Sequence, residues 1–169
     1  MAILAGLRLT AQVWADNVPH TITGGYAATT TATSTPSGTP TQETVYLISS
    51  SMTLRNGRAY RVTVSTLVTG TSPDTARMWV RRTSLTGAVL LDTQRVPMPL
   101  SGSNGRVTWV NIATNQTGGD LTGVLVATIA RSSGTAGVVG SNASSTSPSY
   151  LQVEDVGAAA DYPTATSIT

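Results

Sequence analysis

The stretch Ala59–Thr69, AYRVTVSTLVT, decides the fold class. Side chains of an extended chain point alternately to opposite sides, so a strand separates its two faces with a period of two. Apolar residues of this stretch share one side and polar residues the other: Tyr60, Val62, Val64 and Val68 against Arg61, Thr63 and Ser65. A helix would scatter the same apolar residues around its circumference. The stretch therefore predicts a half-buried antiparallel strand in an all-β protein.

Further segments show strand-like patterning between polar turns: Thr44–Leu54 (one long strand, or two broken near Ser49–Ser51), Ala76–Thr83, Ala88–Arg95, Arg106–Thr114, Thr122–Ala130 and Tyr150–Val156. Short strands at this spacing predict a single jelly-roll-like antiparallel β-sandwich over residues 43–157, with about eight strands. Arg106–Thr114 and Thr122–Ala130 are apolar on both faces, whereas a strand with one wet face alternates cleanly. We therefore expect a second covered surface, beneath an N-terminal arm or another copy of the chain.

Composition narrows the class of protein. The chain has 169 residues, which suits one domain, and it lacks cysteine, which excludes disulfides and thiolate metal sites. A net charge of +2 is too small for a nucleic-acid footprint. No apolar run is long enough to span a membrane, and Met1–Leu7 lacks the basic start of a signal peptide. We therefore expect no nucleic-acid or membrane partner, and a product made in the cytosol.

Residues 1–42 predict an N-terminal arm followed by a linker rich in Thr, Pro and Gly. Thr10 is placed to cap a short helix over Ala11–Asn17 that Pro19 would stop. Two helical turns do not hold together alone in water, so the arm must dock, either on its own domain or on a neighbouring subunit. Its candidate docking side chains are Leu4, Leu7, Leu9, Val13 and Trp14. Thr21–Thr41 shows no hydrophobic period and is interpreted as linker, and residues 158–169 as a polar C-terminal tail.

Residues that carry chemistry are few. His20 is the single histidine, so neither a His-based metal site nor a Ser–His triad can be assembled. Glu154 and Asp155 are neighbours on a strand and must point to opposite faces, so they cannot act on one substrate together. Glu43, Asp74, Asp92 and Asp120 are isolated in sequence and could still converge in space as a carboxylate pair or a loop calcium site, but no motif such as DxDxDG supports one. We therefore expect no enzyme activity, no cofactor and no metal.

Trp79 lies between Arg77 and Arg81 on one face of its predicted strand, with Met78 and Val80 on the other. Guanidinium groups stack favourably on an indole ring. One interpretation is an aromatic platform for a sugar or a base. The other is a tryptophan shielded by arginine stems on the outer sheet face or at a subunit contact.

Both ends of the chain carry a resemblance. The opening, Leu4–Ala11 (LAGLRLTA), and the closing, Ser147–Gly157 (SPSYLQVEDVG), resemble small virion structural proteins of tailed phages that infect actinobacteria. In those proteins an AGxRLTA start leads into a Ser-, Thr- and Gly-rich β-domain that ends with YLxVEDxG. Such proteins are minor tail proteins or capsid decoration proteins, so the resemblance implies a structural component of a virion.

From these observations we predict a homotrimeric β-sandwich that attaches to phage major capsid or tail proteins through its arm. Its role would be to stabilise or decorate the particle. The alternative is a receptor- or carbohydrate-binding module displayed on the virion, which would hold a host surface glycan with exposed Trp79 or tyrosine residues.

Overall fold

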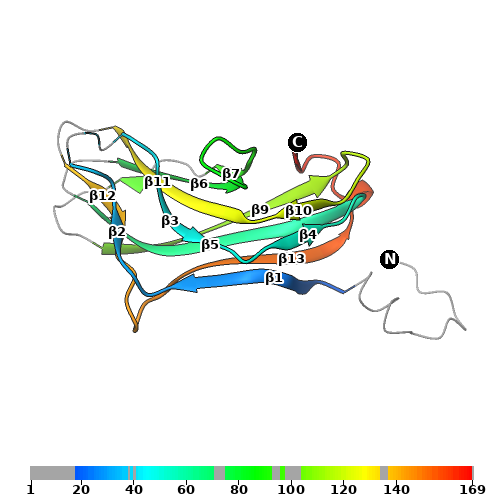
Figure 1. Cartoon of the computed structure of the whole chain (residues 1–169), viewed down its shortest axis with the longest axis horizontal. Helices are drawn as coiled ribbons and strands as arrows, with labels where there is room; N and C mark the ends of the chain where they lie inside the picture. The colour runs from blue at the N-terminus through cyan, green and yellow to red at the C-terminus, as the bar shows by residue number, and fades with distance from the viewer. Residues whose placement is uncertain are drawn as a thin grey trace, which may run out of the picture.

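The computed structural model describes residues 18–37, 39, 41–70, 75–92, 96–97, 104–133 and 137–168. Its strands form a sandwich of two antiparallel sheets, drawn in Figure 1, which confirms the predicted fold class. The predicted helix over Ala11–Asn17 lies outside the described residues. Within the described ranges, helical structure is limited to the 3₁₀ turn η1 (Ala159–Asp161).

The first sheet is built around β5 (Arg58–Gly70), which contains the stretch that decides the fold class. On one side β5 pairs with β13 (Ser149–Ala158) and, further along, with β12 (Val139–Ser141). On its other side β5 pairs with β9 (Asn104–Asn115), and this pairing covers the whole of β9. The sheet is completed by β1 (His20–Thr29) beside β13, β2 (Thr33–Ser34) beside β12, and β14 (Thr166–Ile168) beside β9.

The second sheet runs in the order β3 (Thr44–Ile48), β11 (Leu125–Ser133), β6 (Thr75–Arg82) and β7 (Val89–Asp92), with β8 (Val96–Pro97) also beside β6. A short ladder of β4 (Met52–Leu54) and β10 (Leu121–Gly123) lies at one end of the sandwich. Thr44–Leu54 thus forms two strands, one of the two predicted possibilities. Thr122–Ala130 is also divided, because β10 pairs with β4 and β11 pairs with β3 and β6.

The core lies between the sheets and follows the alternation of β5. Tyr60, Val62, Val64 and Val68 are at most 1% exposed, as their spacing predicts. Thr66 continues the same face and is also fully buried. Its hydroxyl hydrogen-bonds the hydroxyls of Ser141 (2.7 Å) and Ser149 (2.5 Å). Buried polar groups need such partners, so this hydroxyl cluster lets one polar position face an apolar core.

The linker predicted over Thr21–Thr41 is wrong for residues 21–29, which belong to β1 on the edge of the first sheet, and for the two residues of β2. The register between β1 and β13 shifts between Thr21 and Tyr26, so the strand has no continuous period of two to detect. Gly24 lies in this irregularity with φ +77°, and a Cβ there would come within 2.4 Å of the Ser51 carbonyl oxygen. Glycine therefore allows β1 to cross close to the chain that leads into β4.

The polar tail predicted over residues 158–169 is also wrong in part. After η1, the chain returns as β14, parallel to β9, and Ile168 is only 1% exposed. The Tyr162 hydroxyl donates to the Val156 carbonyl oxygen at 3.1 Å, which helps to hold the connecting segment on the sandwich. A single buried apolar residue in a short polar segment leaves too little pattern to predict a strand.

The two segments with apolar residues on both faces lie mainly in β9 and β11, and the structure explains their outer faces differently. In β11, Val126, Thr128 and Ala130 are buried on the outer side, where their register partners on β6 are Arg81, Trp79 and Arg77. The long side chains of the same sheet therefore lie beside these small ones. In β9, Val110 is 55% exposed, so at this position the described part of the chain provides no cover.

Candidate functional site

The structure describes one of the two groups of predicted site residues. Leu4, Leu7, Leu9, Val13 and Trp14 lie outside the described residues, so their docking role stays a prediction. Arg77, Trp79 and Arg81 lie on β6 and point to its outer face. Met78 and Val80 are fully buried on the opposite face, as predicted.

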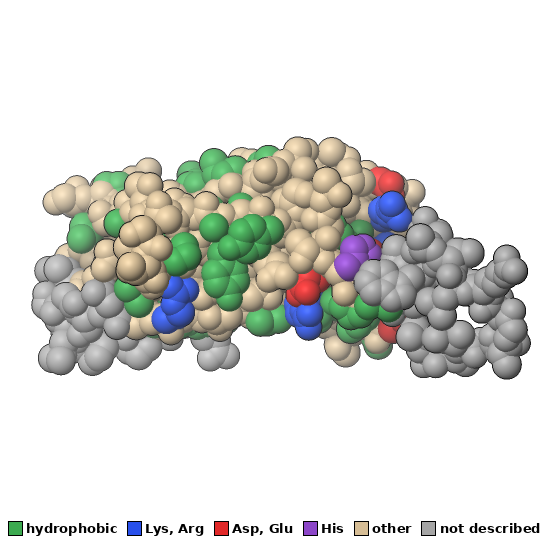
Figure 2. Space-filling view, turned by 90° about the horizontal axis from the view of Figure 1, so that it is seen from below, with side chains coloured by type: hydrophobic (Ala, Val, Ile, Leu, Met, Phe, Trp, Pro, Cys, Tyr) green, Lys and Arg blue, Asp and Glu red, His purple; other side chains and the backbone are tan. Residues whose placement is uncertain are grey.

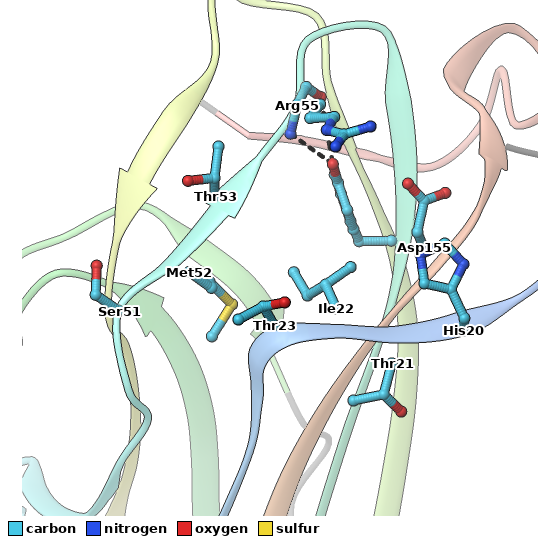
Figure 3. A pocket seen from close by; sticks show the side chains of 10 residues that line it. His20, Thr21, Ile22, Thr23, Ser51, Met52, Thr53, Arg55 and Asp155 are labelled. Atoms are coloured by element: carbon cyan, nitrogen blue, oxygen red, sulfur yellow. Dashed lines mark hydrogen bonds between the residues drawn. The ribbon is translucent and has the colours of Figure 1, made fainter. Parts of the chain in front are cut away.

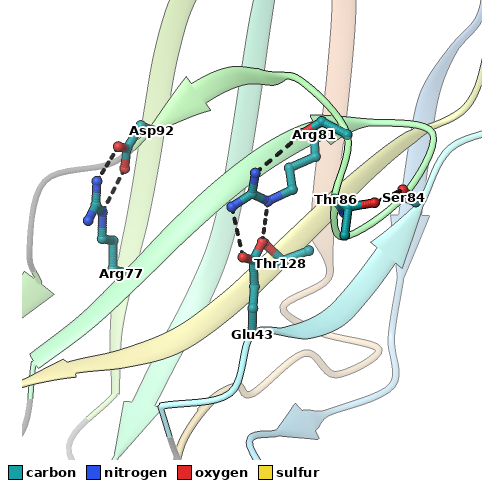
Figure 4. A network of polar contacts seen from close by, with 8 residues as sticks. Glu43, Arg77, Arg81, Ser84, Thr86, Asp92 and Thr128 are labelled. Atoms are coloured by element: carbon teal, nitrogen blue, oxygen red, sulfur yellow. Dashed lines mark hydrogen bonds and ion pairs between the residues drawn. The ribbon is translucent and has the colours of Figure 1, made fainter.

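The two arginines of this group are held by carboxylates from other strands (Figure 4). Arg77 binds Asp92 of β7 with two hydrogen bonds, one of them 2.8 Å long from Nε to Oδ1. Arg81 binds Glu43, which precedes β3, at 2.6 Å and 2.9 Å. Thr128 of β11 donates its hydroxyl hydrogen to the same Glu43 carboxylate. These contacts connect β7, β6 and β11 with the residue that precedes β3, along the outer face of the second sheet.

Trp79 lies between the two ion pairs. The guanidinium carbons of Arg77 and Arg81 lie 5.0 Å and 5.6 Å from the centroid of its ring, within the range of cation–π attraction. The indole is half-buried and is already engaged by cations of its own chain. This geometry matches the interpretation of a shielded tryptophan more closely than that of an open platform.

The network, which we define as Glu43, Arg77, Trp79, Arg81 and Asp92, is balanced in charge. The hydrogen bond that Arg77 donates to Asp92 raises the pKa of Arg77, and the hydrogen bond that Arg81 donates to Glu43 raises the pKa of Arg81. Both cations are therefore stabilised in their charged form. Each carboxylate is bound to its own arginine, so the pair is not arranged for shared acid–base chemistry. The sequence identified Trp79 and both arginines, but their partners are distant in the chain and had no local signal.

A second surface lies on the outer face of the first sheet, and the strand register builds it. Tyr26 of β1 is opposite Gln152 of β13, Gln152 is opposite Thr63 of β5, and Thr63 is opposite Val110 of β9. The next row on this face is Ala28, Tyr150, Ser65 and Thr108. We call these eight residues the tyrosine face. All eight are neutral, and the guanidinium group of Arg106, from the neighbouring row, donates to the Ser65 hydroxyl at 3.1 Å.

The tyrosine face exposes large side chains rather than hiding them. Tyr26 is 56% exposed, and its ring stacks on that of Tyr150 with centroids 6.3 Å apart and an interplanar angle of 24°. Beside the stack, the Gln152 amide donates to the Thr21 hydroxyl at 3.0 Å. Figure 2 views the molecule from the side on which β1 lies, and it shows hydrophobic side chains gathered in the middle of a largely uncharged surface. Aromatic groups among neutral polar ones suit contact with another macromolecule.

Only one of the two stacked tyrosines lies in a stretch that the sequence analysis singled out. Tyr150 belongs to the closing motif that carries the phage resemblance, but Tyr26 lies in the segment interpreted as linker. The motif itself is explained by the fold, since Leu151 and Val153 are fully buried in β13 while Glu154 and Asp155 bind Arg61 and Arg58. The prediction that the two carboxylates point to opposite faces is confirmed.

The described ranges contain neither a group of metal-ligating side chains nor a membrane-spanning helix. No three His, Asp or Glu side chains there are grouped so that they could hold a metal ion. None of the helical structure in the same ranges is long and apolar enough to cross a membrane.

Comparison with known proteins shows only remote structural likeness. No protein-family model and no curated protein matches the sequence. A chain of the T13 IBDV viral particle matches with a TM-score of 0.44 and 10% identity, over 83% of this chain and 36% of that one. A protein described under CBM4 structure and function matches at 0.33 and 14% identity, over 78% and 94%. The enzymatically active domain of bacteriophage CBA120 tailspike protein 4 matches at 0.30 and 13% identity, over 77% and 19%.

These likenesses do not decide the function, because each of the three TM-scores is below 0.5. The chain also spans little more than a third of the IBDV chain that it matches. The function must therefore be argued from the residues of the chain itself.

Proposed function

We propose that this protein is a structural component of a tailed-phage virion, a capsid decoration or minor tail protein that stabilises or decorates the particle. The sequence resemblance at both ends of the chain supports this role. The observation that carries it is the tyrosine face, a set of eight neutral residues in which Tyr150 of the closing motif is stacked on exposed Tyr26. Interface cores are enriched in tyrosine and depleted in charged residues.

In this proposal the protein is a homotrimer that docks on major capsid or tail proteins through its N-terminal arm. Leu4, Leu7, Leu9, Val13 and Trp14 are the arm side chains that would enter the partner. Each such side chain, when fully buried, contributes roughly 1.5–3 kcal/mol. Symmetric repetition over the particle multiplies that contribution. The tyrosine face and the network would remain on the folded domain, available for contacts between subunits.

Incorporation into particles tests the role of the arm. A phage encoding the protein without Met1–Pro19 should produce a folded domain that is absent from purified virions, as measured by quantitative mass spectrometry of the particles. Circular dichroism of the purified truncated protein controls for folding. Virions that still contain the truncated protein at the normal copy number would contradict docking by the arm.

The tyrosine face is tested separately, by the oligomeric state of the purified full chain. We expect light scattering to give the mass of a trimer, and the double substitution Tyr26→Ser and Tyr150→Ser to weaken it. A matched control is Leu85→Ser, which removes another exposed apolar side chain (41% exposed) from a turn outside this face. A wild-type chain that stays monomeric at high concentration would refute the trimer.

The stacked tyrosines also favour a second candidate function, a carbohydrate-binding module that holds a host surface glycan. Aromatic rings beside amide and hydroxyl groups are suited to bind a sugar ring, and Gln152 and Thr63 lie next to Tyr26 in the register. Glycan-array binding by the full chain, lost in Tyr26→Ala, would support this candidate. An array with no binding across host polysaccharides would leave a purely structural role.

A further inference from the structure

A polar pocket at one end of the sandwich is not used by either surface described above. It has a volume of about 360 Å³ and lies between β1 and the segment Ser51–Arg55, which contains β4 (Figure 3). Its lining includes His20, Ile22 and Thr23 from β1 and Arg55 at the end of that segment. The volume is in the lower part of the range of small-molecule sites, so it suits one or two sugar-sized rings.

The two walls of the pocket are held close together by the chain itself. The positive φ of Gly24 lets β1 pass against the Ser51 carbonyl, where a Cβ would come within 2.4 Å. On the opposite side, the backbone N–H of Arg55 donates to the Tyr60 hydroxyl at 2.5 Å, and Tyr60 is a fully buried core residue. The pocket is therefore fixed by β1 on one side and by the core on the other, and needs little reorganisation to bind a ligand.

The charges around the pocket do not cancel. Asp155 is the one acidic residue among the described residues that line it, and Arg58 neutralises it with hydrogen bonds of 2.6 Å, 2.9 Å and 3.2 Å. Arg55 is exposed, and no hydrogen bond or ion pair to its guanidinium group is made by the described residues. Among the described residues, one positive charge thus remains beside the pocket, placed to bind an anion.

The remaining polar groups are hydroxyls and an imidazole. Thr23 and Ser51 line the pocket with hydroxyls that have no partner among the described residues. The Nδ1 atom of His20 lies 3.0 Å from the Val18 carbonyl oxygen, which can only accept, so Nδ1 carries a hydrogen. In the neutral ring Nε2 is then an acceptor for a ligand hydroxyl. Ile22 and Met52 add apolar surface beside these groups, as Figure 3 shows.

We propose that this pocket binds one acidic sugar residue, a hexuronate, with its carboxylate on Arg55. Guanidinium and carboxylate groups form strong charge-assisted hydrogen bonds. The sugar hydroxyls meet Thr23, Ser51 and His20, and the C–H groups of the ring meet Ile22 and Met52. The inference uses only the described domain and does not depend on the proposed role in the virion.

Binding of glucuronate to the full chain tests the proposal, with calorimetry or saturation-transfer NMR as the measurement. We expect saturable binding of glucuronate and at least about tenfold weaker binding of glucose and of the glucuronate methyl ester, which lack the charge. Arg55→Gln should weaken glucuronate binding by about tenfold or more. Thr23→Val keeps the shape of the side chain and should weaken glucuronate binding about threefold, through the loss of one neutral hydrogen bond.

The matched control is Arg82→Gln, which removes a cation from the end of β6, outside the pocket, and should leave glucuronate binding unchanged. The proposal is overturned if the wild-type chain shows no saturable binding of glucuronate. It is equally overturned if glucose binds as well as glucuronate, or if folded Arg55→Gln binds like the wild type. None of these outcomes concerns incorporation into particles. The proposed role in the virion is tested separately, by the incorporation of the truncated protein.

Discussion

Arg58 and Asp155 form the most buried ion pair among the described residues, with side chains 17% and 8% exposed. The shortest of their hydrogen bonds is 2.6 Å, and the Asp155 carboxylate also accepts from the Gly157 backbone N–H at 3.0 Å. The preceding residue, Glu154, points to the opposite face and binds Arg61, whose side chain is 41% exposed. Adjacent carboxylates therefore have matched partners in very different surroundings.

This contrast predicts unequal effects of two neighbouring substitutions on the free energy of unfolding. Asp155→Asn leaves Arg58 charged, largely buried and without its carboxylate, and should destabilise the protein by about 3 kcal/mol. Glu154→Gln removes a partly exposed pair, with Arg61 41% and Glu154 18% exposed, and should cost less than about 1 kcal/mol. Urea unfolding of both variants measures the difference, and equal costs would contradict the assigned surroundings.

Two buried tyrosines predict opposite effects of losing a hydroxyl. The Tyr46 hydroxyl is buried and has no hydrogen-bond partner among the described residues. Tyr46→Phe should therefore raise the free energy of unfolding by about 1 kcal/mol, because a desolvated polar group is removed. Tyr60→Phe loses the hydrogen bond from the Arg55 N–H and should lower the free energy of unfolding by about 1 kcal/mol. Thermal unfolding of the two variants provides the comparison, and a stabilised Tyr60→Phe would contradict it.

The same tyrosines predict a loss of stability at alkaline pH. Burial raises the pKa of Tyr60 from 10.0 to about 12, and burial also raises the pKa of Tyr46. The unfolded chain releases these protons near pH 10, whereas the folded chain retains them. The contribution of the protonated Tyr60 to stability is thus complete below pH 10 and is lost as the pH rises through about 12. Unfolding by urea across this range should show the decline, and Tyr60→Phe should make it shallower.

Two glycines with positive φ predict different costs for an added methyl group. Gly24 (φ +77°) and Gly57 (φ +74°) have similar backbones, but a Cβ at Gly57 meets nothing within 4 Å. Gly57→Ala should cost about 1–2 kcal/mol from the left-handed conformation alone. Gly24→Ala should cost about 1–3 kcal/mol more, because the methyl group collides with the Ser51 carbonyl. Hydrogen exchange should show β1 released only in Gly24→Ala.

The network on the second sheet predicts that Trp79 contributes to stability rather than to glycan binding. Trp79→Ala removes contacts with two ion-paired arginines at 5.0 Å and 5.6 Å and should destabilise the protein by about 1–2 kcal/mol. Glycan-array binding, if the wild type shows any, should be unchanged. Loss of glycan binding with unchanged stability would instead support the open platform.

The prediction of the fold succeeded where the signal was local. The alternation in β5 and the two-faced pattern of β6 are properties of neighbouring residues, and the structure bears them out. β1 was missed because its irregular register at Gly24–Gly25 interrupts the alternation that would have revealed it. β14 was missed because Ile168 alone cannot form a pattern.

By itself, the sequence determined an all-β sandwich, its central strand and the opposite orientation of Glu154 and Asp155, because a period of two follows from backbone geometry alone. Only the tertiary structure decided which charges pair and where a pocket forms. Arg58 and Asp155 are 97 residues apart and Glu43 and Arg81 are 38 apart. Strand order and register, which depend on packing across the whole chain, bring such residues together.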